Sequence, residues 1–253
     1  SMIKLAVFDI DGTVLSHGEH KIESSLAEKL YSLKSKGIQL AFASGRAYKS
    51  QLAILGDLAD GAYLICTEGA AMFFGGKNLY TRILSSSDVL KITRADEYKN
   101  CVISVSVPEC CYVLSGDAER VPEYKSGVHS DEIKTASTLY DIQEPVLKVS
   151  VYSPDFTPKP LLYAPKSVRV CYNANGWCEY VSAIASKGLA VSDLQMRLYL
   201  SKYDTACFGD GANDEDMMKK AKLAVSVNDA AKSLEGVCNV HTDNLPQFLE
   251  ENL

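Results

Sequence analysis

The chain has 253 residues, of which 47% are hydrophobic and 23% are charged, and it carries a formal net charge of −6. These fractions are ordinary for a soluble globular protein and exclude a disordered chain or a coiled coil. The negative charge and the lack of a basic run interleaved with aromatic residues exclude nucleic acid as a partner, and no apolar stretch reaches the roughly 18 to 20 residues that cross a bilayer.

Apolar runs and amphipathic segments alternate in the first third of the chain. Residues 3–8 form a continuous apolar run of the kind that is buried on both faces of a parallel sheet, and Gly37 ends the amphipathic helix that follows. The predicted elements are a strand at 3–8, a helix from 24 or 25 to about 33, a strand at 38–43, a helix at 47–55 and a strand at 62–66.

The pattern changes between about residues 80 and 185. Several segments there alternate apolar and polar residues in the two-residue period of half-buried strands, and Asn175-Gly176 is a strong hairpin-turn signal. The predicted strands lie at 101–107, 111–115, 146–152, 168–172 and 177–182. We expect residues 80–185 to form an inserted α+β module with an antiparallel sheet.

The alternation of helices and strands returns near the C-terminus. The predicted elements are a helix at about 187–200, a strand at 205–208, a helix after Asn213, a strand at 223–227, a short helix around 230 and a strand at 237–240. Strands separated by helices imply right-handed crossovers and helices on both faces of a parallel sheet. Residues 1–79 and 186–253 are therefore predicted to form one α/β domain with a doubly wound, Rossmann-like sheet.

Polar residues gather where the predicted strands end, and the reactive loops of a parallel sheet lie there. The first strand is followed by two carboxylates one residue apart, Asp9 and Asp11, and Gly12 lets backbone amides approach an anion. Carboxylates this close repel each other, and a bound cation is the usual remedy. Taken alone, an acidic capped turn explains this segment equally well.

Two further segments offer groups for an anion. Ser44-Gly45-Arg46 follows the second strand and combines a hydroxyl, a flexible glycine amide and a nearby helix N-terminus. Lys187 opens a helix, where the positive end of the dipole disfavours a cation, and that local cost indicates a function. The ordinary alternatives are a Ser/Gly turn and a solvated surface lysine.

The fourth segment, residues 208–218, carries carboxylates from a strand into a helix. The carboxylates are Asp210 and Asp214, and the glycines on either side of Asp210 permit a tight turn. Hard oxygen ligands of this kind suit Mg²⁺, which takes few carboxylates and keeps water or substrate oxygens in its shell. Glu215 and Asp216 instead favour the helix N-terminus.

These four segments, DxDGT, SGR, SKG and GDGxND in that order, resemble the haloacid dehalogenase superfamily of phosphatases. They cover the predicted parallel domain, and the insert resembles the type II cap of the Cof-type sugar phosphatase branch. The resemblance implies a Mg²⁺-dependent phosphatase that hydrolyses small phosphorylated metabolites, sugar phosphates in particular, through an aspartyl-phosphate intermediate.

The resemblance also implies a role for each motif residue. Asp9 would attack phosphorus, and Asp11 would protonate the leaving oxygen and then activate water. Lys187 would neutralise charge on Asp9 and on the phosphoryl oxygens. The implied phosphate-binding residues are Gly12, Ser44, Gly45, Arg46, Lys187 and Asn213. The implied metal site comprises Asp9, the Asp11 backbone carbonyl, Asp210 and, in support, Asp214.

The chain departs from this family after the third strand, where an Asn-Gly pair is common and this chain has Glu68-Gly69. Glu68 places an anion where an amide would touch substrate or the cap hinge. His17 and His20 have HxxH spacing, but two exposed histidines in a loop are the simpler explanation. His129 and His241 have no evident partner.

Two other functions fit parts of the pattern. A phosphomutase shares DxDGT and a similar cap, but it needs clustered cap cations for a second phosphate, and the arginines of the insert, Arg82, Arg94, Arg120 and Arg169, form no evident cluster. A non-catalytic metabolite-binding regulator has no need for so many like charges around one pocket.

The remaining features concern the compartment. The start of the chain lacks the long apolar region and cleavage site of a secretory signal. The eight cysteines lie mostly inside apolar, strand-like runs without CxxC or Cys/His zinc spacing, so we expect reduced, buried thiols. The expectation is a cytoplasmic monomer or homodimer that binds a small phosphorylated molecule and neither nucleic acid nor membrane.

Overall fold

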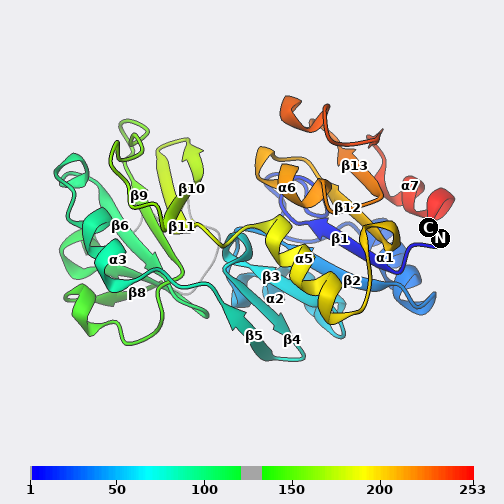
Figure 1. Cartoon of the computed structure of the whole chain (residues 1–253), viewed down its shortest axis with the longest axis horizontal. Coiled ribbons are helices and arrows are strands. Elements are labelled where there is room, and N and C mark those ends of the chain that lie inside the picture. The colour runs from blue at the N-terminus through cyan, green and yellow to red at the C-terminus, as the bar shows by residue number, and fades with distance from the viewer. Residues whose placement is uncertain (1, 121–132) are drawn as a thin grey trace.

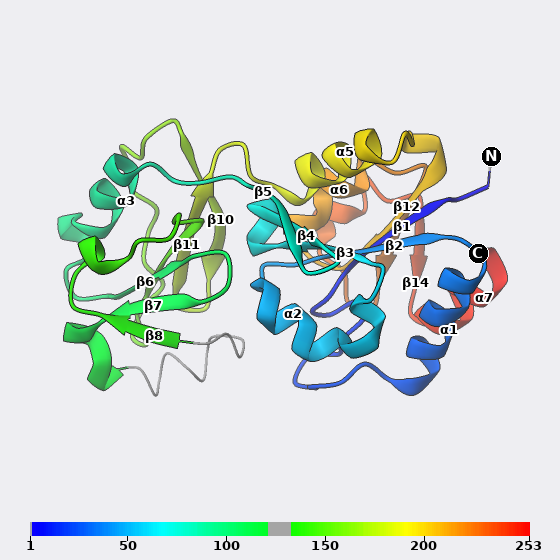
Figure 2. The ribbon, with the colours of Figure 1, turned by 90° about the horizontal axis from the view of Figure 1, so that it is seen from below.

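The computed structural model describes residues 2–120 and 133–253, so His129 lies outside the described residues. Figures 1 and 2 show two β-sheets side by side along the long axis of the molecule, each with its own helices. Both chain ends lie on the side of the larger sheet that faces away from the smaller sheet (Figures 1 and 2). No helix of the described residues combines the length and apolar character needed to span a membrane.

The larger sheet, which we call the core sheet, has eight strands in the order β14-β13-β12-β1-β2-β3-β4-β5. Neighbouring strands from β14 to β3 pair in parallel, as predicted for a doubly wound sheet. Its strands are β1 (Leu5–Asp9), β2 (Gln39–Ala43), β3 (Tyr63–Cys66), β4 (Ala71–Phe74), β5 (Lys77–Thr81), β12 (Thr205–Gly209), β13 (Leu223–Val227) and β14 (Val240–Thr242).

The antiparallel edge of the core sheet was not predicted. β4 and β5 form a hairpin that pairs with β3, and the turn between them is Gly75-Gly76 with φ values of 56° and 78°. Two consecutive residues with positive φ match the right-handed twist of a two-residue hairpin, which is why glycines occupy this turn.

Helices cover both faces of the core sheet, as Figure 2 shows. On one face lie α1 (Ser24–Ser35), α2 (Tyr48–Leu55) and α7 (Leu245–Asn252), and on the other lie α5 (Lys187–Arg197) and α6 (Glu215–Met218). The side chains of β1 alternate between these layers: Phe8 belongs to the cluster of α1 and α7, and Val7 belongs to that of α5 and α6. The strand is therefore apolar throughout because both of its faces are buried.

The smaller sheet, which we call the cap sheet, has six strands in the order β10-β11-β9-β6-β7-β8. It is antiparallel except for the β7–β8 pair, and α3 (Ser86–Thr93) packs on it. Its strands are β6 (Val102–Ser106), β7 (Cys111–Leu114), β8 (Ile133–Ala136), β9 (Lys148–Tyr152), β10 (Val168–Ala174) and β11 (Trp177–Ser182). Asn175 and Gly176 both have positive φ and form the predicted hairpin turn between β10 and β11.

Several elements near the C-terminus differ from the predictions. The helix predicted after Asn213 is a single 3₁₀ turn followed by the four-residue α6, and the helix predicted around residue 230 is a 3₁₀ turn at Lys232–Leu234. The last strand lies at Val240–Thr242, later than predicted. The chain leaves the core sheet after Thr81 and begins α5 at Lys187; the domain boundaries at residues 79 and 185 stay a prediction.

Candidate functional site

The order of the core sheet reverses between β1 and β12. From β1 the chain builds outward to β2 and β3, and from β12 it builds outward in the other direction to β13 and β14. Loops that leave neighbouring strands in opposite directions open a crevice at the carboxyl ends, where ligands of such sheets bind. Asp9 ends β1, Ser44 follows β2 and Asp210 follows β12, so this crevice carries three of the four sequence motifs.

Lys187, from the SKG motif, reaches the same crevice from the first turn of α5. Its Nζ lies 2.6 Å from Asp9 Oδ1 and 2.7 Å from Asp214 Oδ1, and its side chain is fully buried. Burial alone lowers the pKa of Lys187, but the carboxylates of Asp214 and Asp9 raise it well above its usual value. The lysine is therefore a fixed cation, and two carboxylates offset the cost of placing it at a helix N-terminus.

Three carboxylates gather around this lysine. Asp9, Asp210 and Asp214, which we call the acidic trio, each have an oxygen within 4.8 Å of the others. Burial is the largest cause that raises the pKa of Asp9, followed by the charge of Asp214, and burial also raises the pKa of Asp210. Negatively charged carboxylate oxygens that are this close together and this buried repel one another, and a bound divalent cation would offset that repulsion. Carboxylate oxygens are hard ligands, which Mg²⁺ prefers.

The members of the trio are not equivalent. Asp214 Oδ1 is bonded by Lys187, and its Oδ2 accepts the backbone N–H groups of Asp210 at 3.2 Å and Gly211 at 3.0 Å. A carboxylate with both oxygens in use holds a loop in place and has less capacity for a metal. Asp9 and Asp210 are thus better suited to direct contact with a cation than Asp214.

Gly12 allows the first loop to approach Asp210. Its φ is +86°, and a Cβ on this residue would lie 2.0 Å from Asp210 Oδ2, so a side chain does not fit. Thr13 Oγ1 donates to Asp210 Oδ1 at 3.3 Å, and Asn228 Nδ2 donates to the Gly12 carbonyl at 3.1 Å. Sequence reasoning missed the contributions of Thr13 and Asn228, which depend on contacts between residues far apart in the chain.

Asp11 and Arg46 form a bidentate pair beside the trio. Arg46 Nε donates to Asp11 Oδ2 and its second terminal nitrogen donates to Asp11 Oδ1, both at 2.8 Å, while Nη1 donates to Ser50 Oγ at 3.0 Å. The Arg46 side chain is 8% exposed. Arg46, which was predicted to bind phosphate, therefore directs its donors at Asp11 and Ser50 in this structure, and its contact with phosphate stays a prediction.

Three of the other predicted phosphate-binding residues, Ser44, Gly45 and Asn213, contact Glu68. Ser44 is buried and its Oγ accepts the backbone N–H of Arg46 at 3.0 Å. Asn213 Nδ2 donates to Glu68 Oε1 at 3.0 Å, and a Cβ on Gly45 would lie 2.7 Å from the same oxygen. The Glu68 carboxylate therefore contacts Asn213 and lies against Gly45, two of the residues that were predicted to hold a phosphate.

Histidines contribute little to this site. Within residues 2–120 and 133–253, the acidic trio is the one group of three or more Asp, Glu, His or Cys side chains close enough to share a metal ion, and it includes neither His17 nor His20. His17 Nε2 lies 3.6 Å from Asp210 Oδ2, with its side chain 80% exposed. His17 thus lies at the rim of the site.

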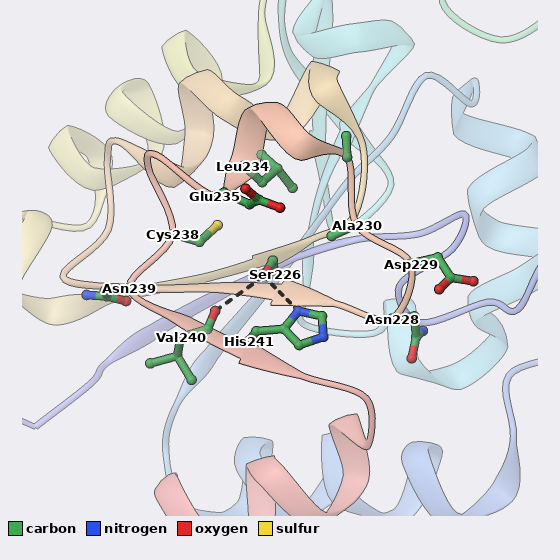
Figure 3. Close-up of a pocket in the computed structure, with 11 residues that line it drawn as sticks. Ser226, Asn228, Asp229, Ala230, Leu234, Glu235, Cys238, Asn239, Val240 and His241 are labelled. Carbon is green, nitrogen blue, oxygen red and sulfur yellow. Dashed lines mark hydrogen bonds between the residues drawn. The ribbon is translucent and has the colours of Figure 1, made fainter.

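A surface cavity of about 610 Å³ lies over β13 and β14 (Figure 3). Ser226 Oγ is hydrogen-bonded to His241 Nδ1 at 2.9 Å and to the Val240 carbonyl at 3.4 Å, the two dashed lines of Figure 3. Ala231, which lines this cavity, donates its backbone N–H to the Asp210 carbonyl at 2.7 Å. The segment that lines the cavity is therefore attached to the loop that carries Asp210.

The raised pKa values make a prediction about metal-free protein. A carboxyl with a raised folded-state pKa stabilises the fold below its unfolded pKa, near 3.8, and loses that contribution as the pH rises through its folded-state value. The Asp210→Asn variant has no carboxyl at residue 210, so this residue contributes no loss of stability as the pH rises. In EDTA, its melting temperature should therefore rise relative to that of the wild type as the pH increases from about 4 to 8.

The same experiment with magnesium provides the control. Mg²⁺ at about 100 times its dissociation constant should stabilise the wild-type protein by about 2.7 kcal/mol and the Asp210→Asn variant by much less. Thermal unfolding in both conditions measures this. A melting-temperature difference between the two proteins that does not change with pH would contradict the electrostatic interpretation of the trio.

Comparisons with known proteins agree with the fold. The family model of haloacid dehalogenase-like hydrolases matches residues 6–246. The HMP-PP phosphatase of Yersinia pseudotuberculosis serotype O:1b (strain IP 31758) is 26% identical over 238 residues, which cover 92% of this chain and 87% of the relative.

Two solved structures share the fold across both sheets. A haloacid dehalogenase-like hydrolase from Bacteroides thetaiotaomicron superposes with a TM-score of 0.87 at 19% identity, covering 99% of this chain and 100% of that one. A HAD subclass IIB sugar phosphatase superposes with a TM-score of 0.83 at 22% identity, covering 98% of each chain. Since the family model spans nearly the whole sequence, this chain belongs to the haloacid dehalogenase-like hydrolases.

Proposed function

We propose that this protein is a Mg²⁺-dependent phosphatase that hydrolyses small phosphorylated metabolites through an aspartyl-phosphate on Asp9. The observation that carries the proposal is the fully buried Lys187, which lies 2.6 Å from Asp9 within the acidic trio. The relatives support the substrate class, because one is named an HMP-PP phosphatase and another a sugar phosphatase.

The chemistry divides into two displacements at phosphorus. In the first, an Asp9 oxygen bonds to phosphorus, the bond to the leaving oxygen breaks, and Asp11 protonates that oxygen. In the second, Asp11 takes a proton from water, the water oxygen bonds to phosphorus, and Asp9 is released with inorganic phosphate. Lys187 holds the Asp9 carboxylate in position and offsets negative charge throughout.

The groups around the reacting phosphorus would stabilise negative charge. A magnesium ion held by Asp9, the Asp11 carbonyl and Asp210 would neutralise charge on the phosphoryl oxygens. Ser44 and the Gly45 amide would donate hydrogen bonds to the same oxygens. Asp214 orients Lys187 and the loop that carries Asp210, through the contacts described above.

The cap sheet would limit the access of water. Leu147 just before β9, Val181 of β11 and Ala185 just after β11 belong to the same buried cluster as Cys66 and Ala70 of the core. An apolar contact of this kind between cap and core would help to exclude water near the crevice, which favours transfer to Asp9 over side reactions.

The contacts of the arginines do not favour a phosphomutase. Arg82 stacks on Tyr80, Arg94 donates to Tyr140 Oη, Arg120 pairs with Asp117, and Arg169 donates to the Ala185 carbonyl. Each is engaged at a different place, whereas a mutase needs a cationic cluster for a second phosphate.

Phosphate release from p-nitrophenyl phosphate tests the proposal. We expect release that requires Mg²⁺, stops on addition of EDTA and resumes when Mg²⁺ is restored. Turnover that is insensitive to EDTA, or formation of an isomerised sugar phosphate that depends on a bisphosphate activator, would reject it.

Arg46 offers a test of the acid–base role of Asp11. Lysine cannot reproduce the two parallel hydrogen bonds of the guanidinium, so Arg46→Lys should misplace the Asp11 carboxyl. We expect kcat to fall by about 10²-fold for an alkyl phosphate such as glycerol 3-phosphate. The loss should be smaller for p-nitrophenyl phosphate, whose leaving group needs little protonation; equal losses for both would contradict the positioning role.

A further inference from the structure

Glu68 is a buried carboxylate that has no role in the mechanism above. It lies directly after β3 and is 6% exposed. Its backbone N–H donates to the Ser44 carbonyl at 3.1 Å, and the N–H of Thr67 donates to the Arg46 carbonyl at 2.9 Å. The Glu68 turn is therefore attached to the loop that we propose binds phosphate.

The backbone of this turn is unusual. Thr67, Glu68 and Gly69 have φ values of 50°, 57° and 84° in succession. The left-handed region is rare for a residue other than glycine and rarer still for a β-branched one, and such outliers gather at functional sites. At Gly69, a Cβ would lie 2.1 Å from the carbonyl oxygen of Ser186, so the turn packs directly against the start of α5.

The two oxygens of Glu68 are in different situations. Oε1 accepts the hydrogen bond from Asn213 at 3.0 Å and lies against Gly45. No hydrogen bond to Oε2 is formed by any residue in the described part of the chain. Glu68 is more than nine-tenths buried, yet Oε2 is not among the fully enclosed side-chain atoms that lack a partner. This oxygen is therefore an acceptor that water or a ligand can reach beside the proposed phosphate-binding groups.

The cap sheet contributes further charges on this side. Lys148 of β9 lies 3.2 Å from Glu179 Oε1 of β11, which also accepts from Ser150 Oγ at 2.8 Å. Burial raises the pKa of Glu68, and the positive charges of Lys187 and Lys148 oppose that rise, so Lys148 acts on Glu68 across the two sheets. In Figures 1 and 2, β10 and β11 lie on the side of the cap sheet nearest the core.

We propose that Glu68 is a specificity residue, whose free oxygen accepts a hydrogen bond from a hydroxyl or amino group on the substrate's leaving group. The inference rests on the proposed phosphatase function and narrows its substrates to polyol or amino-alcohol monophosphates. An ionised carboxylate accepts hydrogen bonds and donates none. A second anionic group on the leaving group would meet Glu68 as a buried like charge, which opposes binding.

A matched pair of ligands tests this selection. Glycerol 3-phosphate and 3-phosphoglycerate differ mainly in a hydroxymethyl group replaced by a carboxylate. Each is measured as a competitive inhibitor of p-nitrophenyl phosphate turnover, so that neither has to be a substrate. We expect wild-type protein to bind glycerol 3-phosphate at least about tenfold more tightly, on the order of the 1.4 kcal/mol that a tenfold ratio represents.

The Glu68→Gln variant removes the charge and retains an oxygen that can accept from Asn213. Its amide N–H can also donate to a carboxylate. The ratio of the inhibition constants of 3-phosphoglycerate and glycerol 3-phosphate should therefore fall to about one. Glu250→Gln, which changes an exposed carboxylate of α7 paired with Lys29, should keep the wild-type preference. Circular dichroism and melting temperatures confirm that both variants are folded.

The outcomes separate the two proposals. Three results would overturn the role of Glu68 and leave the proposed phosphatase function standing. They are an inhibition-constant ratio that is unchanged in Glu68→Gln, tighter binding of 3-phosphoglycerate by the wild type, and no inhibition by either compound. Absence of Mg²⁺-dependent turnover of p-nitrophenyl phosphate by the wild-type protein would instead overturn the proposed function itself.

Discussion

Replacing Asp9 with asparagine should reduce phosphate release from p-nitrophenyl phosphate by about 10⁴- to 10⁶-fold, the range expected when a nucleophile is removed. An amide of nearly the same shape cannot form the aspartyl-phosphate. The fold should persist, because Lys187 retains its 2.7 Å contact with Asp214 and one of two closely spaced buried carboxylates is neutralised.

The control for this variant is Asp243→Asn, which changes an exposed carboxylate beyond β14 that pairs with His241. It should keep wild-type kcat. Mass spectrometry of protein quenched during turnover should find a phosphoryl group on the peptide that contains residue 9 in the wild type and in Asp243→Asn, and none in Asp9→Asn. If Asp9→Asn instead kept activity within about tenfold of the wild type, Asp9 could not be the nucleophile.

Replacing Lys187 with methionine should have the largest effect on stability. The lysine is fully buried between two carboxylates, and loss of one partner of a buried ion pair typically costs about 3 to 5 kcal/mol because an uncompensated charge remains. In EDTA we therefore expect a melting temperature lower by about 10 °C in a chain of this size. Activity should be lost as well.

A double variant separates charge from packing. In Lys187→Met/Asp214→Asn, the second change removes one of the two stranded carboxylates, so part of the lost stability should return while activity stays absent. Chemical denaturation of the four proteins of this cycle measures the coupling. A Lys187→Met variant as stable as the wild type in EDTA would contradict the ion-pair arrangement at the centre of the site.

Strand-end motifs could be predicted because a parallel sheet places its carboxyl ends at one edge. Asp9 follows an apolar run that both helical layers bury, and Asp210 follows another, so topology alone brings their loops together. The edge strands were harder to predict. β8, Ile133–Ala136, has two exposed residues in four and no alternating apolar pattern, so only its pairing with β7 defines it as a strand.

Contacts between loops could not be predicted for a related reason. The bond between Asn213 and Glu68 joins residues 145 positions apart, and that between Asn228 and Gly12 joins residues 216 positions apart. Both depend on how irregular loops orient their side chains, and no periodicity encodes this. The pairing of Arg46 with Asp11 is similar, since the sequence indicates an anion partner for Arg46 without indicating which anion.

A crystal structure of the protein with Mg²⁺ and fluoroberyllate, a mimic of a phosphoryl group on a carboxylate, tests the central claim most directly. The account predicts beryllium bonded to an Asp9 oxygen and one magnesium ion, with Asp9 and Asp210 oxygens at about 2.1 Å from the metal. A fluoroberyllate on another residue, or a metal bound away from the acidic trio, would contradict it.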